Sequence, residues 1–344
     1  MLLAMIDAQK MGELQLIGRI RAGAASRNAG VRVGIGDDCA VLRVRTGSEL
    51  VVTTDFSLEG RHFRRDWHSP QSAGHRCLAR GLSDVAAMGG RPLAAFLSIA
   101  LPKGFFTPFH SIVPNQMVWT DGVGWLDGFM EGFNALAAQH GVELAGGDTS
   151  EAPGEEILAD VMVLGEVKRG MALLRSGARV GDGMYVTGTL GGAAAELAGL
   201  AAGSVASAPQ TMKPFERGHP GAYPQSFPEP RVAVGLALAR RGIASSCMDL
   251  SDGLSSDVRR ICEASGVGAE MNSAAIPLGV GATLEQALHG GEDYELLFTA
   301  RPDVKVPRRI AGVGITRIGT IVAAKGVRLD GRELQPGGWE HFSG

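Results

Sequence analysis

The 344-residue chain has little cysteine, few aromatic residues and no long apolar run. Its four cysteines form no CxxC pair, which excludes a zinc ribbon and indicates reduced thiols in a cytoplasmic protein. The longest apolar stretch, residues 93–101, is far shorter than the roughly 20 residues of a membrane-spanning helix. The net charge of −3 indicates no basic surface for nucleic acid or an anionic membrane.

Several well-known catalytic signatures are also missing. The sequence contains no GxxxxGK[ST] phosphate loop, no protein-kinase HRD and DFG pair, and no GxSxG nucleophile elbow. The first ten residues include Asp7 and lack a basic start, so they do not predict a secretion signal. Phosphate-loop enzymes and protein kinases are therefore excluded as templates for the function, whereas composition does not exclude Ser-His-Asp catalysis without that elbow.

Glycine is the residue present in excess. The chain holds 50 glycines, about twice the usual share of roughly 7 %, together with 16 prolines. The 45 % hydrophobic content is ordinary, so a sizeable core is expected. The glycines therefore indicate a folded protein in which the backbone turns sharply or closely approaches another group at many places.

Helical and extended patterns alternate along both halves of the chain. Residues 12–27, 70–88, 125–139, 231–241 and 254–265 have helical spacing, whereas 31–42, 50–54, 94–101, 142–145, 157–167, 184–187 and 246–250 resemble strands. Residues 103–124 and 203–230 are expected to be long loops. We therefore predict an α/β (α+β) protein with an N-terminal domain over 1–168 and a C-terminal α/β domain over 169–344.

Acidic residues recur beside Gly, Ser or Thr where predicted strands end. Six segments show this pattern: 36–38, 53–55, 83–84, 146–149, 249–253 and 290–293. Since ligands of open sheets bind beyond the strand ends, these segments are expected to line one pocket. Clustered carboxylates repel one another unless they bind cations, and oxygen ligands without His or Cys favour Mg²⁺. The pattern predicts a nucleotide phosphate chain held through several Mg²⁺ ions.

Each of these residues also has an ordinary structural interpretation. A single Gly-Asp pair is most often a turn, Asp249 and Ser251 suit the cap of the following helix, and Asp252 suits its dipole. His62, Arg175 and Trp339 stand alone in plain segments, where a structural histidine, a surface ion pair and a packing residue are the usual roles. These alternatives remain open at the level of residue patterns.

Nine segments in this order resemble the thiamine-monophosphate kinase family, within the superfamily of aminoimidazole-ribonucleotide synthetase. They are GIGDDCAVL (34–42), TTD (53–55), EGRHF (59–63), LARGLSDVAAMGGRP (78–92), GGDTS (146–150), LLRSGARVGD (173–182), MDLSDGL (248–254), GGEDYELLFT (290–299) and GWEHF (338–342). The resemblance covers nearly the whole chain and implies the two-domain fold of aminoimidazole-ribonucleotide synthetase.

The resemblance also implies a set of site residues. The metal ligands it implies are Asp38, Thr53, Thr54, Asp55, Asp84, Asp148, Asp249 and Asp252. ATP would contact Gly147, Asp148, Arg175 and Ser251, and thiamine monophosphate would contact His62, Glu292 and Trp339. Asp84, Asp148 and Asp252 are the acids expected to act in catalysis. The implied reaction is in-line, Mg²⁺-dependent transfer of the γ-phosphoryl group of ATP to thiamine monophosphate, in a homodimer joined through the N-terminal domains.

Two other functions are compatible with parts of the pattern. Another ATP-using enzyme of the superfamily is one, but the chain ends in HFSG without the terminal cysteine of the hydrogenase-maturation enzymes. A binding protein without catalysis is the second, and the complete set of acids argues against it. The chain also departs from the family pattern, with a long segment at 103–124 and with Arg80 and Gly81 where Val and Asn are more familiar.

Overall fold

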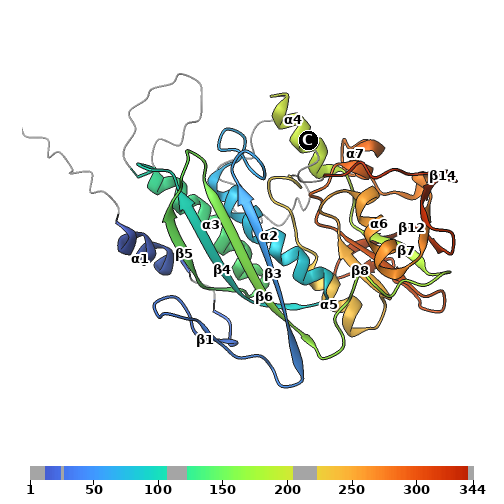
Figure 1. Cartoon of the computed structure of the whole chain (residues 1–344), viewed down its shortest axis with the longest axis horizontal. Helices are drawn as coiled ribbons and strands as arrows, with labels where there is room; N and C mark the ends of the chain where they lie inside the picture. The colour runs from blue at the N-terminus through green and yellow to red at the C-terminus, as the bar shows by residue number, and fades with distance from the viewer. Residues whose placement is uncertain (1–11, 25–26, 107–121, 204–222, 340–344) are drawn as a thin grey trace, which may run out of the picture.

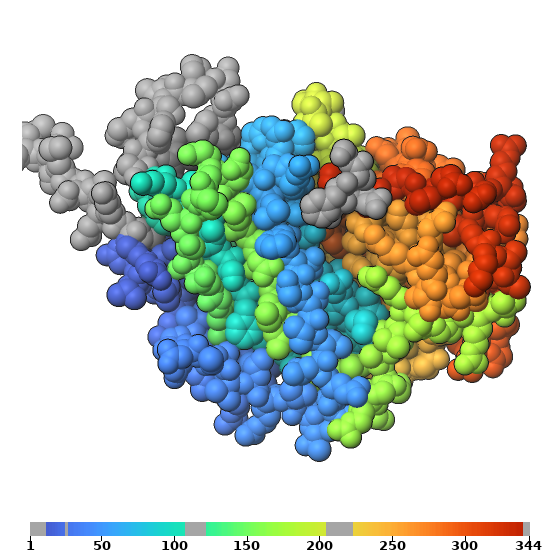
Figure 2. All heavy atoms as spheres, in the orientation of Figure 1, coloured from blue at the N-terminus to red at the C-terminus, as the bar shows by residue number. Residues whose placement is uncertain are grey.

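The structure is a computed structural model of the chain, and it describes residues 12–24, 27–106, 122–203 and 223–339. Two lobes lie side by side, with N-terminal residues in one and C-terminal residues in the other (Figure 2). Most of the expected loops at 103–124 and 203–230 lie outside the described residues. Among the residues that are described, no helix is both long and apolar enough to cross a membrane.

A four-stranded sheet forms the N-terminal lobe. Its strands are ordered β3 (Ser48–Leu58), β6 (Leu158–Lys168), β4 (Arg91–Leu101) and β5 (Glu143–Glu151), and only the β4–β5 pair is parallel. Helices α2 (Pro70–Ala87) and α3 (Gly122–His140) cover one face of this sheet (Figure 1). Ser69 caps α2 by accepting a hydrogen bond from the Ser72 amide, and Pro70 opens its first turn, as the sequence predicts.

The other face of this sheet carries apolar side chains that the described residues leave exposed. Successive residues of a strand point to opposite faces, so Val51, Thr53, Asp55 and Ser57 face the helices. Leu50, Val52 and Phe56 alternate with them and are 47 %, 55 % and 62 % exposed, and Met162 of β6 is 38 % exposed. We call this surface the outer face of the sheet. Its contiguous apolar area is typical of an interface.

An eight-stranded sheet forms the C-terminal lobe. The order is β14-β13-β9-β12-β7-β10-β8, with β11 paired to β12, and only the β13–β9 pair is parallel. The strands are β7 (Gly183–Thr187), β8 (Ser246–Asp249), β9 (Gly268–Met271), β10 (Leu296–Ala300), β11 (Arg309–Ile310), β12 (Val313–Val322), β13 (Gly326–Leu329) and β14 (Arg332–Glu333). The predominance of antiparallel pairs makes the protein α+β, which is one of the two forms that the sequence predicts.

Shorter elements complete the described chain. They are α1 (Glu13–Gly23), β1 (Val31–Val33), β2 (Val41–Leu42), α4 (Gly192–Ala201), α5 (Val232–Arg240), α6 (Leu254–Ser265), the 3-10 helix η1 (Ser273–Ala275) and α7 (Leu284–His289). β1 and β2 form the strand-turn-strand unit expected at 31–42, and α6 ends at Gly266 in the left-handed conformation.

Helix α2 joins the two lobes. Two side chains near the start of α2 bind the segment that precedes α5. The Ser72 hydroxyl donates to the Ser226 carbonyl at 2.7 Å, and His75 Nε2 donates to the Pro228 carbonyl at 2.7 Å. A Cβ added at Gly235 of α5 would lie 1.9 Å from the Ala86 carbonyl oxygen, so the two helices touch backbone to backbone. One continuous apolar core consequently runs from the four-stranded sheet into the C-terminal lobe.

Three predictions about strand ends are wrong. The sequence predicts strand ends at Asp55 and Asp148, but these residues lie in the interiors of β3 and β5. β5 continues through Gly146 and Gly147 because a register shift against β4 accommodates the glycines. The segment at 290–293 does not follow a strand, since it connects α7 to β10. Glycine next to aspartate therefore marks close backbone packing here rather than the end of pairing.

We predict that Gly132→Ala strongly destabilises the protein. A Cβ at this position of α3 would lie 1.9 Å from the Gln71 carbonyl oxygen of α2, so the helices must separate. The free energy of unfolding should fall by about 2–3 kcal/mol in urea denaturation. Gly18→Ala in α1 is the control, because its Cβ would meet no atom within 4 Å and should stabilise the helix by up to about 1 kcal/mol. Equal effects would contradict the packing argument.

We also predict that His75 makes the protein less stable as the pH falls. Burial keeps the pKa of His75 at about 4 in the folded state, below its ordinary 6.5. Between these values the unfolded state binds more protons, so the free energy of unfolding decreases with falling pH, by up to about 1.4 kcal/mol per pH unit for one group. Denaturation of wild type and His75→Gln from pH 7 to 4.5 should give a shallower slope for the variant. Identical slopes would show that His75 is not held neutral.

Candidate functional site

A cavity of about 350 Å³ lies between the two lobes and collects most of the predicted site residues. Its carboxylates come from both lobes: Asp55, Asp84, Asp249, Asp252 and Glu292. The remaining lining residues are Arg61, His62, Arg80, Leu197, Ser251, Gly290, Tyr294 and Trp339. The structure therefore brings together four predicted metal ligands, one predicted ATP contact and all three predicted substrate contacts.

Three buried or half-buried carboxylates form the centre of this cavity. Asp55 is on the helix-facing side of β3, Asp84 is on α2, and Asp249 is the last residue of β8. Burial, reinforced by the negative charge of Asp84, raises the pKa of Asp55 to about 7. The same two causes raise the pKa of Asp249 well above its ordinary value. The three groups thus repel one another, and a cation between them would be strongly favoured.

Two hydroxyl groups hold these carboxylates in place. The Thr53 hydroxyl donates to Asp84, and the Ser83 hydroxyl donates to Asp249 Oδ2 at 2.8 Å. Thr53 and Asp55 are two residues apart on β3, so both side chains point toward α2. The carboxylates are therefore oriented by neighbours that leave their other oxygens available to a ligand.

The loop before α6 supplies Ser251 and Asp252. Asp252 forms an ion pair with Arg260 at 2.5 Å, and its carbonyl accepts a hydrogen bond from the Trp339 amide at 3.0 Å. Helix α6 begins after Gly253, whose amide donates to Asp257 Oδ2 at 3.2 Å. The capping interpretation of Asp249 and Ser251 is therefore wrong, and both side chains line the cavity instead.

Glu292 lines the same cavity beyond Arg80, whose guanidinium lies 3.8 Å from Asp55 and 3.5 Å from Glu292. Burial opposes its ionisation, but Arg76 and Arg80 outweigh burial and hold the pKa of Glu292 below its ordinary value. Arg76 Nη2 donates to Glu292 Oε1 at 2.8 Å and to the His62 carbonyl at 2.8 Å. Glu292 and Tyr294 have φ values of 56° and 49°, a strained conformation that is characteristic of functional sites.

His62 and Trp339 also line this cavity. His62 Nδ1 accepts a hydrogen bond from the Leu58 amide at 2.9 Å, which fixes the ring at the end of β3. Trp339 is 53 % exposed, so its indole face is accessible to a ligand. An exposed aromatic ring beside a polar cavity suits stacking on a flat heterocycle.

The remaining predicted residues do not line this cavity. Strand register places Gly147 beside Leu97 and Asp148 beside Ser98, so Asp148 shares the outer face with Phe56. Asp148 is also separated from Asp55 by three strand spacings, about 14 Å. Thr54 points to the outer face as well, where its hydroxyl donates to Asp160 at 3.2 Å.

Asp38 and Arg175 lie apart from both groups of acids. Asp38 is exposed in the loop between β1 and β2, and Arg175 is exposed in the segment before β7, where its carbonyl accepts from Ser265. A Cβ at Gly147, whose φ is 147°, would lie 1.8 Å from the Leu97 carbonyl oxygen, so only glycine fits there. The predicted site residues therefore do not form one group within a single copy of the chain. They lie in the cavity, on the outer face of the sheet, and in the exposed segments that contain Asp38 and Arg175.

A metal ion would have to be held here by few protein ligands. Within the described ranges, no three Asp, Glu, His or Cys side chains converge closely enough to form a metal site on their own. The carboxylates of Asp55 and Asp249 that neighbour Asp84 nevertheless offer only oxygen ligands and carry excess negative charge. Both properties suit a hard divalent cation. Mg²⁺ commonly uses one or two carboxylates together with water and substrate phosphates, so the arrangement fits that ion.

Sequence reasoning missed three residues of the site. Arg76 and Arg80 reach Glu292 from α2, and the Tyr294 hydroxyl lies 3.1 Å from Arg80 Nη1. The signal was present, since residues 76, 80 and 84 are spaced by four and therefore share one helix face. The spacing therefore predicts that both arginines lie beside Asp84.

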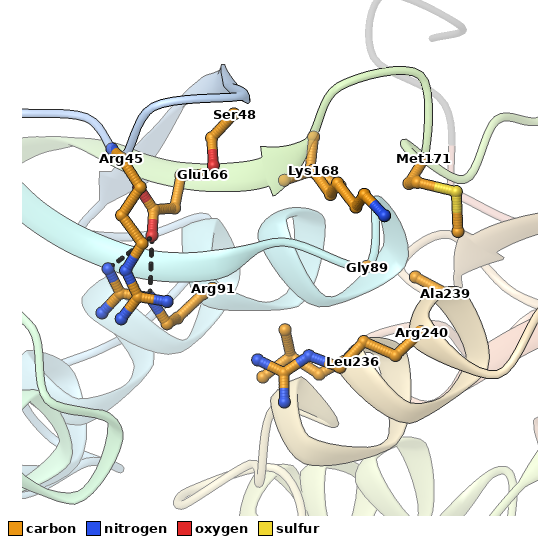
Figure 3. A pocket seen from close by; sticks show the side chains of 11 residues that line it. Arg45, Ser48, Gly89, Arg91, Glu166, Lys168, Met171, Leu236, Ala239 and Arg240 are labelled. Carbon is orange, nitrogen blue, oxygen red and sulfur yellow. Dashed lines mark hydrogen bonds and ion pairs between the residues drawn. The ribbon is translucent and has the colours of Figure 1, made fainter.

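A second cavity of about 350 Å³ lies near the C-terminal ends of α2 and α5 (Figure 3). It contains none of the predicted site residues. Its one carboxylate, Glu166, is paired with Arg91 at 2.6 Å and with Arg45 at 3.1 Å. The cavity between the lobes is consequently the better candidate for catalysis.

Comparisons with known proteins identify the family to which the chain is similar. Two family models match, described as AIR synthase related protein, N-terminal domain, over residues 36–167, and AIR synthase related protein, C-terminal domain, over residues 179–332. The thiamine-monophosphate kinase of Salmonella typhimurium is 37 % identical over 324 residues, which is 91 % of each chain.

Solved structures give the same result. The crystal structure of thiamine-monophosphate kinase from Stenotrophomonas maltophilia K279a matches with a TM-score of 0.75 and 35 % identity, over 94 % of this chain and 98 % of that one. A structure described as AaThiL complexed with AMPPCP and TMP matches with a TM-score of 0.69 and 30 % identity, over 96 % and 97 % of the two chains.

Proposed function

The chain belongs to the AIR synthase related family and, within it, to the thiamine-monophosphate kinases, and on this premise we propose that it makes thiamine diphosphate by direct in-line transfer of the γ-phosphoryl group of ATP. The observation that carries the proposal is the cavity between the lobes. It combines three mutually repelling aspartates with an aromatic, a histidine and a glutamate on the other side. The neighbour solved with AMPPCP and TMP supports both substrates.

Phosphoryl transfer to a phosphate acceptor mainly requires that donor and acceptor be aligned and that the negative charge of the phosphates be neutralised. A phosphate monoester is already largely ionised near neutral pH, so the acceptor oxygen needs no strong general base. This agrees with a cavity whose lining includes only one histidine. Holding donor and acceptor in line would then supply most of the rate enhancement.

Mg²⁺ is the metal that we propose for this site. Several ions would share Asp55, Asp84, Asp249, Asp252 and the Thr53 hydroxyl, so that each ion is held by one or two of these groups together with water and substrate phosphates. When bound, the ion would neutralise phosphate charge during transfer. The mutual repulsion of the aspartates supports this, because a cation relieves it. Asp38, Thr54 and Asp148 would bind further ions outside this cavity.

The residues on the other side would position the acceptor. Trp339 would stack on a ring of thiamine monophosphate, and His62 and Glu292 would orient it by hydrogen bonds. Ser251 would contact ATP in this cavity, where Asp84 and Asp252 are the proposed catalytic acids. The resemblance also implies that Gly147 and Arg175 contact ATP and that Asp148 acts in catalysis, but these three residues lie outside the cavity in one copy of the chain. The ionised state of Glu292, which Arg76 and Arg80 enforce, suits a cationic thiazolium ring.

We further propose a cytoplasmic homodimer joined through the outer face. Four large apolar side chains are exposed there, and pairing with a second copy would remove them from water. Thr54 and Asp148 lie on the same face, so a second copy would surround them. The free cysteines support a reducing compartment.

The direct test is a coupled assay for ADP with thiamine monophosphate, ATP and Mg²⁺. A folded sample should release ADP only when thiamine monophosphate is present, and mass spectrometry should detect thiamine diphosphate. Tight binding of thiamine monophosphate without ADP release would instead identify a binding protein and refute the proposed reaction.

We predict that Asp84→Asn separates activity from stability. The variant should lose at least about 100-fold in kcat, because one charge that orients the phosphates is gone. In Mg²⁺-free buffer its free energy of unfolding should rise by about 1 kcal/mol, because Asp84 no longer repels Asp55 and Asp249. Asp66→Asn, which removes a surface partner of Arg64, is the control and should leave kcat unchanged. An active Asp84→Asn would remove Asp84 from the proposed machinery.

We predict that Phe56→Asp produces monomers. Phe56 is 62 % exposed on the outer face, near the end of the edge strand β3, where a buried carboxylate would oppose pairing. Light scattering after gel filtration should give a dimer for wild type and about half that mass for the variant. Val280→Asp, at a 99 % exposed position in the other lobe, should remain dimeric. A dimeric Phe56→Asp, or a monomeric wild type, would refute this interface.

A further inference from the structure

Arg80 places a fixed positive charge between the two halves of the cavity. Its Nη2 lies 3.8 Å from Asp55 Oδ1, and its Nη1 lies 3.5 Å from Glu292 Oε1. Asp55 belongs to the aspartates proposed for Mg²⁺, and Glu292 belongs to the residues proposed for the acceptor. A ligand that extends from one group to the other therefore has to pass the Arg80 guanidinium.

The internal partners of Arg80 leave part of its hydrogen-bonding capacity unused. Its one hydrogen bond of ordinary length is from Nη1 to the Tyr294 hydroxyl, at 3.1 Å. The 3.8 Å contact with Asp55 is too long for a hydrogen bond, and Nε is buried with no partner among the described residues. A guanidinium offers five N–H donors, so donors remain for a ligand in the cavity.

The need for a positive charge beside Glu292 does not explain the presence of Arg80 in the cavity. Arg76 is 2 % exposed and already donates to Glu292 Oε1 at 2.8 Å, the length of a strong charge-assisted hydrogen bond. The longer contact from Arg80 adds little to that pair. A second arginine that is 17 % exposed at its side chain and loosely held suggests a different function.

We propose that Arg80 is a substrate-contacting residue, whose guanidinium binds the phosphate oxygens of the acceptor and so selects phosphorylated over unphosphorylated thiamine. The inference rests on the proposed function and adds a specificity-determining residue to it. The acceptor phosphate is a dianion entering a cavity lined with aspartates, and a permanently charged guanidinium offsets their repulsion. Its planar donors also match two phosphate oxygens, which an ammonium group does not.

Binding of two ligands that differ only in the phosphate tests this proposal. Calorimetry with Mg²⁺ present would compare thiamine monophosphate and thiamine on wild type, Arg80→Met and Arg80→Lys. Arg80→Met should bind thiamine monophosphate at least about tenfold more weakly and thiamine within about twofold of wild type. Arg80→Lys should recover part of the loss. In steady state, KM for thiamine monophosphate should rise by a similar factor, and KM for ATP should stay within about twofold.

The controls separate this proposal from its premise. Arg240→Met removes an exposed arginine at the other cavity and should bind both ligands like wild type. Unchanged binding of both ligands by Arg80→Met, or an equal loss for both, would overturn the role of Arg80 while wild-type turnover still supports the kinase. A wild type that neither binds nor converts thiamine monophosphate would refute the kinase and this inference together. Melting temperatures of all variants would identify any loss of fold.

Discussion

The close packing of α2 against both lobes is the constraint on which the rest of the structure depends. One side of this helix contacts α3 at distances that exclude any side chain at Gly74, where a Cβ would lie 1.8 Å from the Phe129 carbonyl oxygen. Another side contacts α5 at Ala86 and the segment at 225–228 through Ser72 and His75. Since α2 also carries Asp84, Arg76 and Arg80, its position fixes the distance between the two sides of the cavity.

The position of α2 brings aspartates, a glutamate and arginines together in one cavity that is partly shielded from water. Removing a carboxylate from water costs free energy unless a partner compensates, and the two halves of the cavity differ in this respect. Glu292 has a short ion pair with Arg76, and it stays ionised. Asp55 has the more distant Arg80, Asp249 has the Ser83 hydroxyl, and both face Asp84, so burial and that negative charge raise their pKa values. The uncompensated half is therefore where an added cation would contribute most stability.

Much of the fold was predictable from local patterns, because caps and periodicity act over a few residues. Ser69-Pro70 fixed the start of α2, and Gly266 marked the end of α6. Long-range register was not predictable. The glycines at 146 and 147 looked like a strand end, yet pairing with β4 carries β5 past them. The residues of the cavity were found through motifs, whereas Arg80 was passed over because its importance comes from Asp55 and Glu292, which are distant in sequence. The boundary at residue 168 stays a prediction.

Strand register and pleat also explain why the sequence alone does not show which site residues lie in the cavity and which lie on the outer face. Thr53 and Thr54 are neighbours in the chain, but the pleat sends Thr53 to Asp84 in the cavity and Thr54 to Asp160 on the outer face. The proposed catalytic cavity and the proposed dimer surface are consequently two sides of the same strand. Any contact that twists β3 at the outer face would also move Asp55 relative to Asp84. Assembly and phosphate binding would then be coupled through a single layer of backbone, with no separate element needed to connect them.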